Sequence, residues 1–134
     1  MNEQEFMIRE IKTPLKQDYE NDLHWLCESL GFISNRDFEK TGAKIFCSIV
    51  RSNSHGIKSE EIAKECKITK GNVIHHLSKY IKAGIVIRDK NKYYLRSRSI
   101  EKSLDEMQLD LLRTLQKIRT IAKEVDKELG YIER

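Results

Sequence analysis

The sequence predicts a mainly α-helical fold that contains one small β-hairpin and ends in a long helix. Three observations lead to this prediction. Apolar residues recur with a helical period before Gly84, an extended β-branched and aromatic pattern follows directly after it, and a heptad pattern begins at Leu111. With 134 residues, one proline and six glycines, the chain has the length and composition of one folded domain rather than of a disordered or collagen-like protein.

Two helices are predicted in the first part of the chain. The residues before Thr13 are weakly amphipathic, and this pattern is compatible with a short helix or with a frayed arm. Thr13 then provides a helix N-cap and Pro14 a first helical residue, and the apolar stripe that follows ends at Gly31. A second helix runs from a cap at Asp37 to a turn at residues 53–56. Both stripes are typical of core helices.

The middle of the chain predicts a helix-turn-helix followed by a hairpin. A short third helix is capped by Ser59, and a fourth begins at a Thr69 cap and ends at Gly84. Ile85–Arg88 and Lys92–Leu95 then predict two short strands joined by a turn. A helix-turn-helix followed at once by a basic hairpin is the winged-helix arrangement.

A long last helix is predicted from Ser99 or Ser103 to Gly130, with Ser103 and Glu106 as a capping box. Its apolar residues alternate at spacings of four and three, while its other faces are charged. This seam consists of Leu111, Leu115, Ile118, Ala122, Val125, Leu129 and Ile132. Because an apolar seam on a charged helix needs a partner, we expect a homodimer. Part of the seam could instead pack on the first helix, whose apolar stripe from Leu15 to Leu30 is a possible partner within or across subunits.

Several classes of function find no support in the sequence. No run approaches the ~18 apolar residues of a membrane-spanning helix, and the first ten residues lack the pattern of a signal peptide. We therefore expect a cytoplasmic protein with no membrane partner. The three cysteines and four histidines have neither disulfide nor zinc spacing, so we expect reduced core thiols and no metal or cofactor. For Cys66 the alternative is a redox thiol beside Lys67. No catalytic triad and no glycine-rich phosphate loop is present, and an enzyme is not expected.

Positive charge is concentrated between Lys67 and Arg98, where nine basic residues stand against Asp89 alone, a net charge of +8 in a chain of +4. On the fourth helix, the face opposite the apolar stripe is small, polar or basic. Such a face can approach a DNA groove, hydrogen-bond to base edges and contact phosphates. The predicted DNA-contacting residues are Lys70, Gly71, Asn72, His75, Ser78, Lys79 and Lys82 on the helix, and Arg88, Lys90, Lys92 and Arg96 on the hairpin. The alternative interpretation is an ordinary solvated face.

Three further side chains in this region have ambiguous roles. His76 falls at the edge of the apolar stripe, which favours packing over base recognition. Tyr93 and Tyr94 point to opposite sides of a strand, so one should pack on the core and the other should face outward. The presence of a tyrosine at the outward-facing position is explained equally well by strand propensity alone and by a contact with DNA.

The stretch from Thr69 to Arg96 resembles the recognition helix and wing of ArsR-type winged-helix repressors. The matching residues are Thr69, Val73, His75, His76, Leu77, Ala83, Gly84, Tyr93 and Leu95, and a looser likeness extends upstream to Asp37. Several archaeal regulators of this type also have a long helix after the wing. The resemblance implies DNA binding and dimerisation. The metal-sensing Cys-x-Cys pair of the family would fall at Lys58 and Glu60, so metal sensing is not implied.

Together these observations predict a sequence-specific, double-stranded-DNA-binding transcriptional regulator that acts as a homodimer. Residues 1–36 would form an N-terminal helical extension, residues 37–98 the winged helix-turn-helix DNA-binding domain, and residues 99–134 the C-terminal dimerisation helix. Within the last segment, the predicted dimer contacts are Leu111, Leu115, Ile118, Ala122, Val125 and Leu129. The alternative is a winged helix that serves as a protein-assembly module in a multi-subunit complex. A small-molecule effector, the operator and the direction of regulation cannot be read from these residues.

Overall fold

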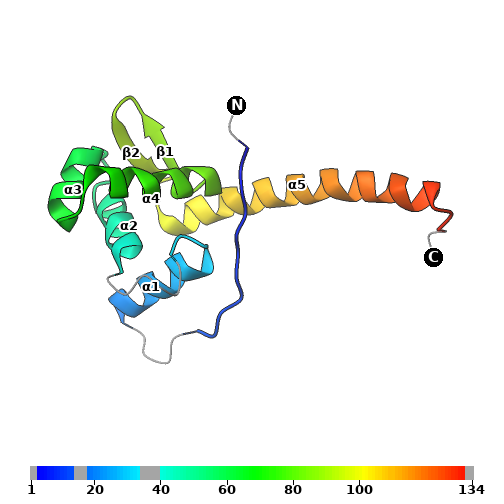
Figure 1. Ribbon diagram of the computed structural model, residues 1–134, viewed down its shortest axis with the longest axis horizontal. Coiled ribbons are helices and arrows are strands. Elements are labelled where there is room, and N and C mark those ends of the chain that lie inside the picture. The colour runs from blue at the N-terminus through cyan, green and yellow to red at the C-terminus, as the bar shows by residue number, and fades with distance from the viewer. Residues whose placement is uncertain (1–2, 14–17, 34–39, 132–134) are drawn as a thin grey trace.

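The computed structural model describes residues 3–13, 18–33 and 40–131 (Figure 1). Five helices and one antiparallel hairpin follow each other in these ranges: α1 (Tyr19–Ser29), α2 (Thr41–Arg51), α3 (Ser59–Cys66), α4 (Lys70–Ala83), β1 (Val86–Asp89), β2 (Lys92–Leu95) and α5 (Ile100–Glu128). Helices α1 to α4 and the hairpin gather into one head, and α5 projects away from it (Figure 1). The predicted fold class, mainly helical with a small hairpin and a long last helix, is confirmed.

The core of the head fixes α4 against α2. The ring of Tyr80 on α4 lies 4.5 Å from the ring of Phe32 and 5.7 Å from that of Phe46, measured between centroids. The Tyr80 hydroxyl donates a hydrogen bond to the Gly42 carbonyl oxygen at 2.5 Å, which satisfies its polar end inside the core. Gly42 also lets Ile33 pack closely, because a Cβ at this position would lie 2.3 Å from Cγ2 of Ile33 and 3.3 Å from the Tyr80 hydroxyl oxygen. The buried side of α4 is thereby held in place, and its opposite side is left at the surface.

The helix-turn-helix has the predicted ends, apart from one cap. Thr69 caps α4 by accepting a hydrogen bond at Oγ1 from the amide of Asn72, and Gly84 ends the helix at φ 87°. Lys67 ends α3 in the left-handed region at φ 56°. The predicted Ser59 cap is wrong by one residue: Lys58 is the N-cap, with no side-chain cap bond, and Ser59 is the first helical residue.

The hairpin pairs Val86 with Leu95 at its base and Asp89 with Lys92 at its tip. Tyr93 is buried and exchanges two backbone hydrogen bonds with Ile57, at 2.8 and 3.2 Å. The segment before α3 therefore pairs with β2 at this residue, beside the two strands of the hairpin. Tyr94 is half-buried and covers Gly56, where a Cβ would lie 2.5 Å from its ring. The expected division between the two tyrosines is found, with Tyr93 as the core residue.

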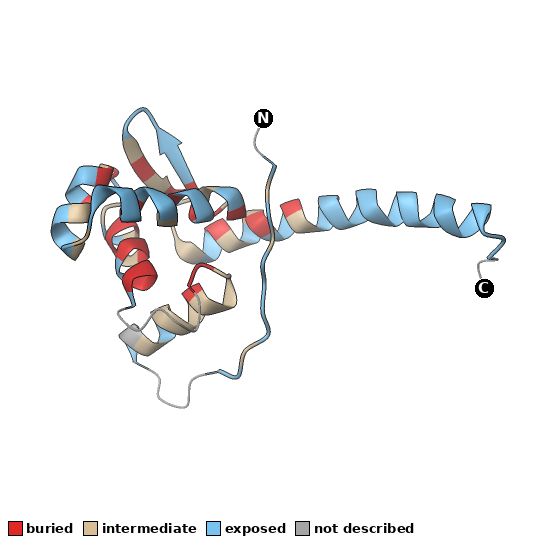
Figure 2. Cartoon of the chain, in the orientation of Figure 1, coloured by how far each residue is buried: buried red, intermediate tan, exposed pale blue. Residues whose placement is uncertain are grey.

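The long helix begins at the earlier of its two predicted starts. Ser99 is the N-cap of α5 and accepts a hydrogen bond from the amide of Lys102 at 3.0 Å. The predicted capping box of Ser103 and Glu106 is wrong: Ser103 lies inside the helix, fully buried, where its Oγ accepts from the amide of Ser97 and donates to the Ser99 carbonyl. Beyond the first three turns the helix leaves the head, and residues 112–131 are exposed (Figure 2).

The N-terminal part differs from its prediction at the start of the first helix. Residues 3–13 are extended and form an arm, one of the two expected forms. Helix α1 begins six residues after the predicted cap at Thr13, because Asp18 caps it through a 2.8 Å bond from the amide of Asn21. Pro14 and the predicted cap Asp37 lie outside the described residues. Lys40 at φ 56° immediately precedes α2.

Among the residues that the structure describes, no helix combines the length and the apolar character needed to cross a bilayer.

Candidate nucleic-acid interface

The predicted DNA-contacting residues of α4 share one accessible face of the head. All seven of them are exposed: Lys70, Gly71, Asn72, His75, Ser78, Lys79 and Lys82. The opposite face of the same helix carries Val73, Leu77 and Tyr80, which are buried. The exposed face of α4 lies toward the viewer in Figure 2, uncovered by other elements of the head. The structure therefore brings these residues together on a surface that a large ligand can reach.

The first turn of α4 offers the closest approach to its backbone. A Cβ on Gly71 would have no heavy atom of the described chain within 4 Å. Gly71 also does not adopt a positive φ, so neither packing nor backbone conformation requires a glycine here. Asn72 and His75 lie on the exposed face beside it, with side chains that can donate and accept hydrogen bonds. A small residue next to two polar ones leaves room for a partner to contact both.

The lysines of α4 have weak partners within the chain. Lys70 forms an ion pair with Glu60 on α3 at 2.7 Å, and this bond lowers the pKa of the Glu60 carboxyl. Lys82 lies 3.8 Å from the carboxylate of Glu5 in the N-terminal arm. In both pairs more than half of each side chain is exposed, so each pair contributes little to stability and its lysine can turn to an external anion at low cost.

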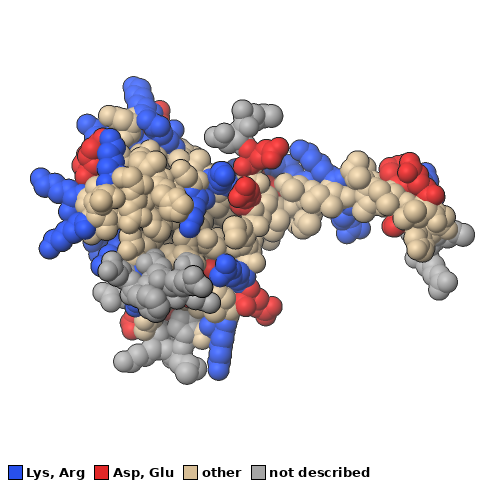
Figure 3. All heavy atoms as spheres, viewed as in Figure 1, with Lys and Arg blue, Asp and Glu red and all other residues tan. Residues whose placement is uncertain are grey.

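The wing extends the basic surface beyond the helix. Arg88 donates from Nε to the Lys90 carbonyl oxygen at 2.9 Å and lies 5.9 Å from the centre of the Tyr93 ring. Lys90 occupies the tip at φ 60°, and Lys92 reaches the His55 carbonyl oxygen at 3.3 Å. Figure 3 shows lysine and arginine side chains over the wing and at both ends of α4. The wing and α4 thus present positive charge on neighbouring surfaces.

Arg96, the last predicted contact, lies in a different environment. Its guanidinium forms a bidentate ion pair with Asp110 on α5, and its Nε lies 3.4 Å from the carboxylate of Glu106. A second cation, Arg113, also binds Asp110. The hydrogen bond to Arg96 holds the pKa of Asp110 below its ordinary value, and the pKa of Arg96 is raised in turn. This contact fastens the end of the wing to α5.

His76 is half-buried on the side of α4 that faces α2. Its ring lies 6.3 Å from that of Tyr80, and a Cβ on Gly42 would lie 3.4 Å from its Nδ1. This position supports the packing role that the sequence favoured. Among the described residues, no group of three or more histidine, cysteine or acidic side chains has the geometry of a metal site.

One contributor to this surface was missed from the sequence. The N-terminal arm runs past the second half of α4, where the amide of Glu5 donates to the Lys82 carbonyl at 2.9 Å and Gln4 donates to that of Ala83. The arm and α4 border a cleft of about 450 Å³ that includes His75 and Lys79. No sequence signal marks this contact, because an extended arm has no periodicity of its own.

Comparison with known proteins agrees with this geometry. Residues 57–88 match the family model described as "Bacterial regulatory protein, arsR family". The matched stretch includes α3, α4 and the first three residues of β1, so the predicted resemblance is confirmed there. The match supports a helix-turn-helix of a DNA-binding regulator. No curated protein and no solved structure matches the chain at a significant level.

Proposed function

We propose that the protein is a sequence-specific regulator of transcription that binds double-stranded DNA as a homodimer. The observation that carries this proposal is the exposed, basic and polar face of α4 next to a basic wing, on a helix-turn-helix that matches a family of regulatory proteins. An ordinary solvated face would not explain why the positive charge continues from the helix to the hairpin.

The proposed contacts divide between α4 and the wing. Helix α4 would enter the major groove, with Asn72 and His75 reading base edges and Gly71 allowing the backbone to approach. Phosphates would be contacted by Lys70, Ser78, Lys79 and Lys82 from the helix and by Arg88, Lys90 and Lys92 from the wing. We propose that Arg96 acts on DNA indirectly, because its guanidinium already binds Asp110.

Helix α5 supports the proposal of a dimer. Leu115, Ile118, Val125 and Leu129 are exposed although their spacing forms one seam, and Leu111 is half-buried where the helix leaves the head. Burying a large aliphatic side chain stabilises an assembly by about 1.5 to 3 kcal/mol. Residues 112–131 are exposed, so the described residues do not include a seam folded back on α1 of the same chain. Pairing of the seam with α1 of a second copy stays the alternative. We propose that the α5 helix of a second copy covers the seam, because it has the same spacing of apolar residues.

We further propose a division of the chain into three functional parts. Residues 37–98 would bind DNA, residues 99–134 would form the dimerisation helix with its contacts between 111 and 129, and residues 1–36 would support the head. We infer that the protein is one of the regulators, archaeal members included, that lack metal-sensing cysteines, since Lys58 and Glu60 occupy the positions of that pair. Its effector, if it has one, would then be of another chemical class.

The first experiment measures binding to mixed-sequence duplex DNA by fluorescence polarisation over a range of salt concentrations. A protein that neutralises phosphates loses affinity with a slope of about −0.9 per phosphate in a log–log plot. We expect a steep slope from seven candidate phosphate contacts. A winged helix that assembles with proteins instead would bind weakly at every salt concentration, and this result would exclude the DNA-binding proposal.

The second experiment selects sequences from randomised duplexes. A symmetric dimer should enrich a pseudo-palindrome whose half-site centres lie about one helical turn, or a multiple of it, apart. Asn72→Ala and His75→Ala should change the enriched bases, whereas Gln116→Ala, an exposed polar residue of α5, should not. Enrichment without a dyad would contradict the dimer, and unchanged preferences in both α4 variants would contradict their role in base recognition.

A further inference from the structure

A second accessible site lies on the side of the head formed by α1, α2 and α3. The three helices border a cleft with a volume of about 470 Å³. Two of the three cysteines line it: Cys47 on α2 and Cys66 on α3, both half-buried. Cys27, by contrast, is 0% exposed in the core. The expectation of three core thiols is therefore correct for Cys27 and wrong for Cys47, which faces the cleft.

The thiol of Cys47 has a polar neighbour. Its Sγ lies 2.6 Å from the hydroxyl oxygen of Tyr19, which joins α1 to α2. Tyr19 is 60% exposed, so small molecules can reach the contact from solvent. Cys66 differs: its Sγ lies 3.7 Å from Ser48 Oγ, and its side chain packs against the core. Of the two thiols in the cleft, Cys47 is the one beside an ionisable partner.

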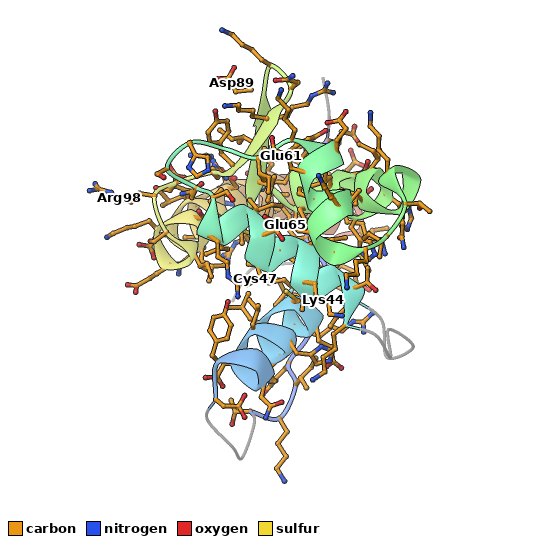
Figure 4. All side chains as sticks on the ribbon, turned by 90° about the vertical axis from the view of Figure 1, so that its left-hand side faces the viewer. Lys44, Cys47, Glu61, Glu65, Asp89 and Arg98 are labelled. Carbon is orange, nitrogen blue, oxygen red and sulfur yellow. The ribbon has the colours of Figure 1, made fainter. Side chains whose placement is uncertain are left out.

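Positive charge surrounds Cys47. Lys44 and Arg51 stand three residues before and four residues after it on α2, and thus on the same face of the helix. Lys40, immediately before α2, also lines the cleft, and Glu65 on α3 is its one acidic lining residue within the described chain. Figure 4 shows Lys44 and Cys47 on α2 with Glu65 above them. The electrostatic interaction with Cys47 is the main cause that raises the pKa of Arg51 above its ordinary value.

We propose that Cys47 is a site of covalent modification by small anionic disulfides, with the cationic cleft as the binding site of the anion. The thiolate is the nucleophilic form of cysteine, and the cations that line the cleft attract an anionic reagent toward it. The thiolate attacks one sulfur of the disulfide, and a new Sγ–S bond forms. The sulfur–sulfur bond of the reagent breaks, and its electron pair leaves with the second sulfur as a thiolate. No other oxidant is required.

Modification would also change the contact between α1 and the rest of the head. A sulfur in a mixed disulfide has no proton to donate and no negative charge, so the bond to Tyr19 is lost or weakened. Since this bond joins α1 to α2, we expect α1 to become more dynamic in the adduct. The proposal does not depend on DNA binding and is tested without DNA.

The experiment compares two reagents on the full chain. Dithiobis(nitrobenzoate) is a dianionic disulfide, and dithiodipyridine is a neutral one. Peptide mass spectrometry assigns the rate of modification to each cysteine, in the native chain and in the chain unfolded in urea. We expect Cys47 to react first, with the ratio of anionic to neutral rate about tenfold higher in the native chain than in the unfolded one. This preference should fall as salt is added.

Two variants that each remove one positive charge distinguish an effect of the cleft from an effect of the protein's net charge. Arg51→Gln should lower the rate with the anionic reagent much more than the rate with the neutral one, and thus remove much of the anionic preference. Lys64→Gln, an exposed residue of α3 outside the cleft, should leave both rates unchanged. Hydrogen exchange of the Cys47 adduct should show faster exchange in α1, and Cys47→Ser should abolish this effect of the reagent.

Three outcomes would overturn the proposal. In the first, Cys66 or Cys27 reacts before Cys47. In the second, the ratio of the anionic to the neutral rate is the same in the native and the unfolded chain. In the third, Lys64→Gln reduces the anionic preference as much as Arg51→Gln does. The first outcome would place the reactive thiol elsewhere. The others would show that the cleft does not select anions.

Discussion

Replacing Asp110 with asparagine should destabilise the fold by about 2 to 3 kcal/mol. The Asp110 carboxylate is 9% exposed and accepts hydrogen bonds from Arg96, which is 27% exposed, and from Arg113. Hydrogen bonds to charged groups contribute roughly 1.5 to 3 kcal/mol each. The substitution removes the negative charge of the nearer of its two acidic partners and leaves the half-buried guanidinium of Arg96 with Glu106 alone. For a domain of this size, the melting temperature should fall by about 6 to 12 °C.

The pH dependence follows from the direction of the pKa shift. The hydrogen bond from Arg96 lowers the pKa of Asp110 in the folded chain, while in the unfolded chain it should be about 3.9. The carboxylate therefore stabilises the fold fully above this unfolded value, and the contribution disappears as the pH falls through the folded value. The asparagine variant has no such titration. The difference in stability between the two proteins should be constant near pH 7 and should shrink below about pH 4.

Urea titration followed by circular dichroism measures this difference. Urea is preferred to guanidinium chloride because a salt would screen the ion pair. All samples need the same protein concentration, since association stabilises the folded form. Asp105→Asn is the matched control: it lies on the same helix, 3.9 Å from Lys102 and more than half exposed, and should cost less than about 0.5 kcal/mol. Equal effects of the two substitutions, or a difference that does not shrink at all as the pH falls below about 4, would refute the reasoning.

Three further predictions concern DNA binding and assembly. Gly71→Ala should stabilise the fold by about 0.5 kcal/mol in thermal melts. It should nevertheless weaken binding to the selected DNA site by about 1 kcal/mol or more, because the added methyl group occupies the surface that approaches the bases. Lys90→Ala should reduce the salt slope of DNA binding by about one unit, whereas Arg96→Ala should lower stability and leave the slope unchanged. Ile118→Lys should give a monomer in sedimentation at micromolar concentration, while Thr120→Lys, on the opposite face of α5, should leave the mass of the assembly unchanged.

The helix-turn-helix could be predicted from the sequence because its signals are local. Thr69 bonds to an amide three residues later, and Gly84 supplies a left-handed residue at the end of the same helix. The apolar stripe between them faces the core as its period requires. Each of these features depends on residues within one or two turns of one another.

The start of the first helix could not be predicted in this way. Thr13 is a good cap by type, but the arm before it is held by distant contacts: Trp25 donates from its indole nitrogen to the Lys12 carbonyl at 3.1 Å, and the amide of Arg9 donates to the Ser29 carbonyl at 2.8 Å. These bonds keep the arm extended, and Asp18 caps the helix instead. Tertiary contacts therefore decided between two caps that are equally acceptable locally.

The same limit applied to the candidate sites. Arg96 has the same charge as Lys90, and only the position of Asp110, fourteen residues later, distinguishes a structural cation from a free one. Cys47 resembled the other cysteines because each lies in an apparently helical pattern. Its cleft arises where α1, α2 and α3 meet, which no periodicity of a single helix reveals.

The position of Asp110 also connects the head to the proposed dimer contact. Ser103, Met107 and Asp110 are buried, so the first turns of α5 belong to the head, and the exposed seam begins directly after them on the same continuous helix. From Asp110 to Leu129 the helix extends by about 28 Å at 1.5 Å per residue.

If two copies pair along this length, the crossing point of the two α5 helices sets the distance and angle between their α4 helices, because no flexible segment separates the seam from the head. In such a dimer α5 would determine the half-site spacing of the operator, and the Arg96–Asp110 contact would hold α5 in a fixed orientation to the wing. Loosening that contact should broaden the range of tolerated spacings without changing the bases that α4 prefers.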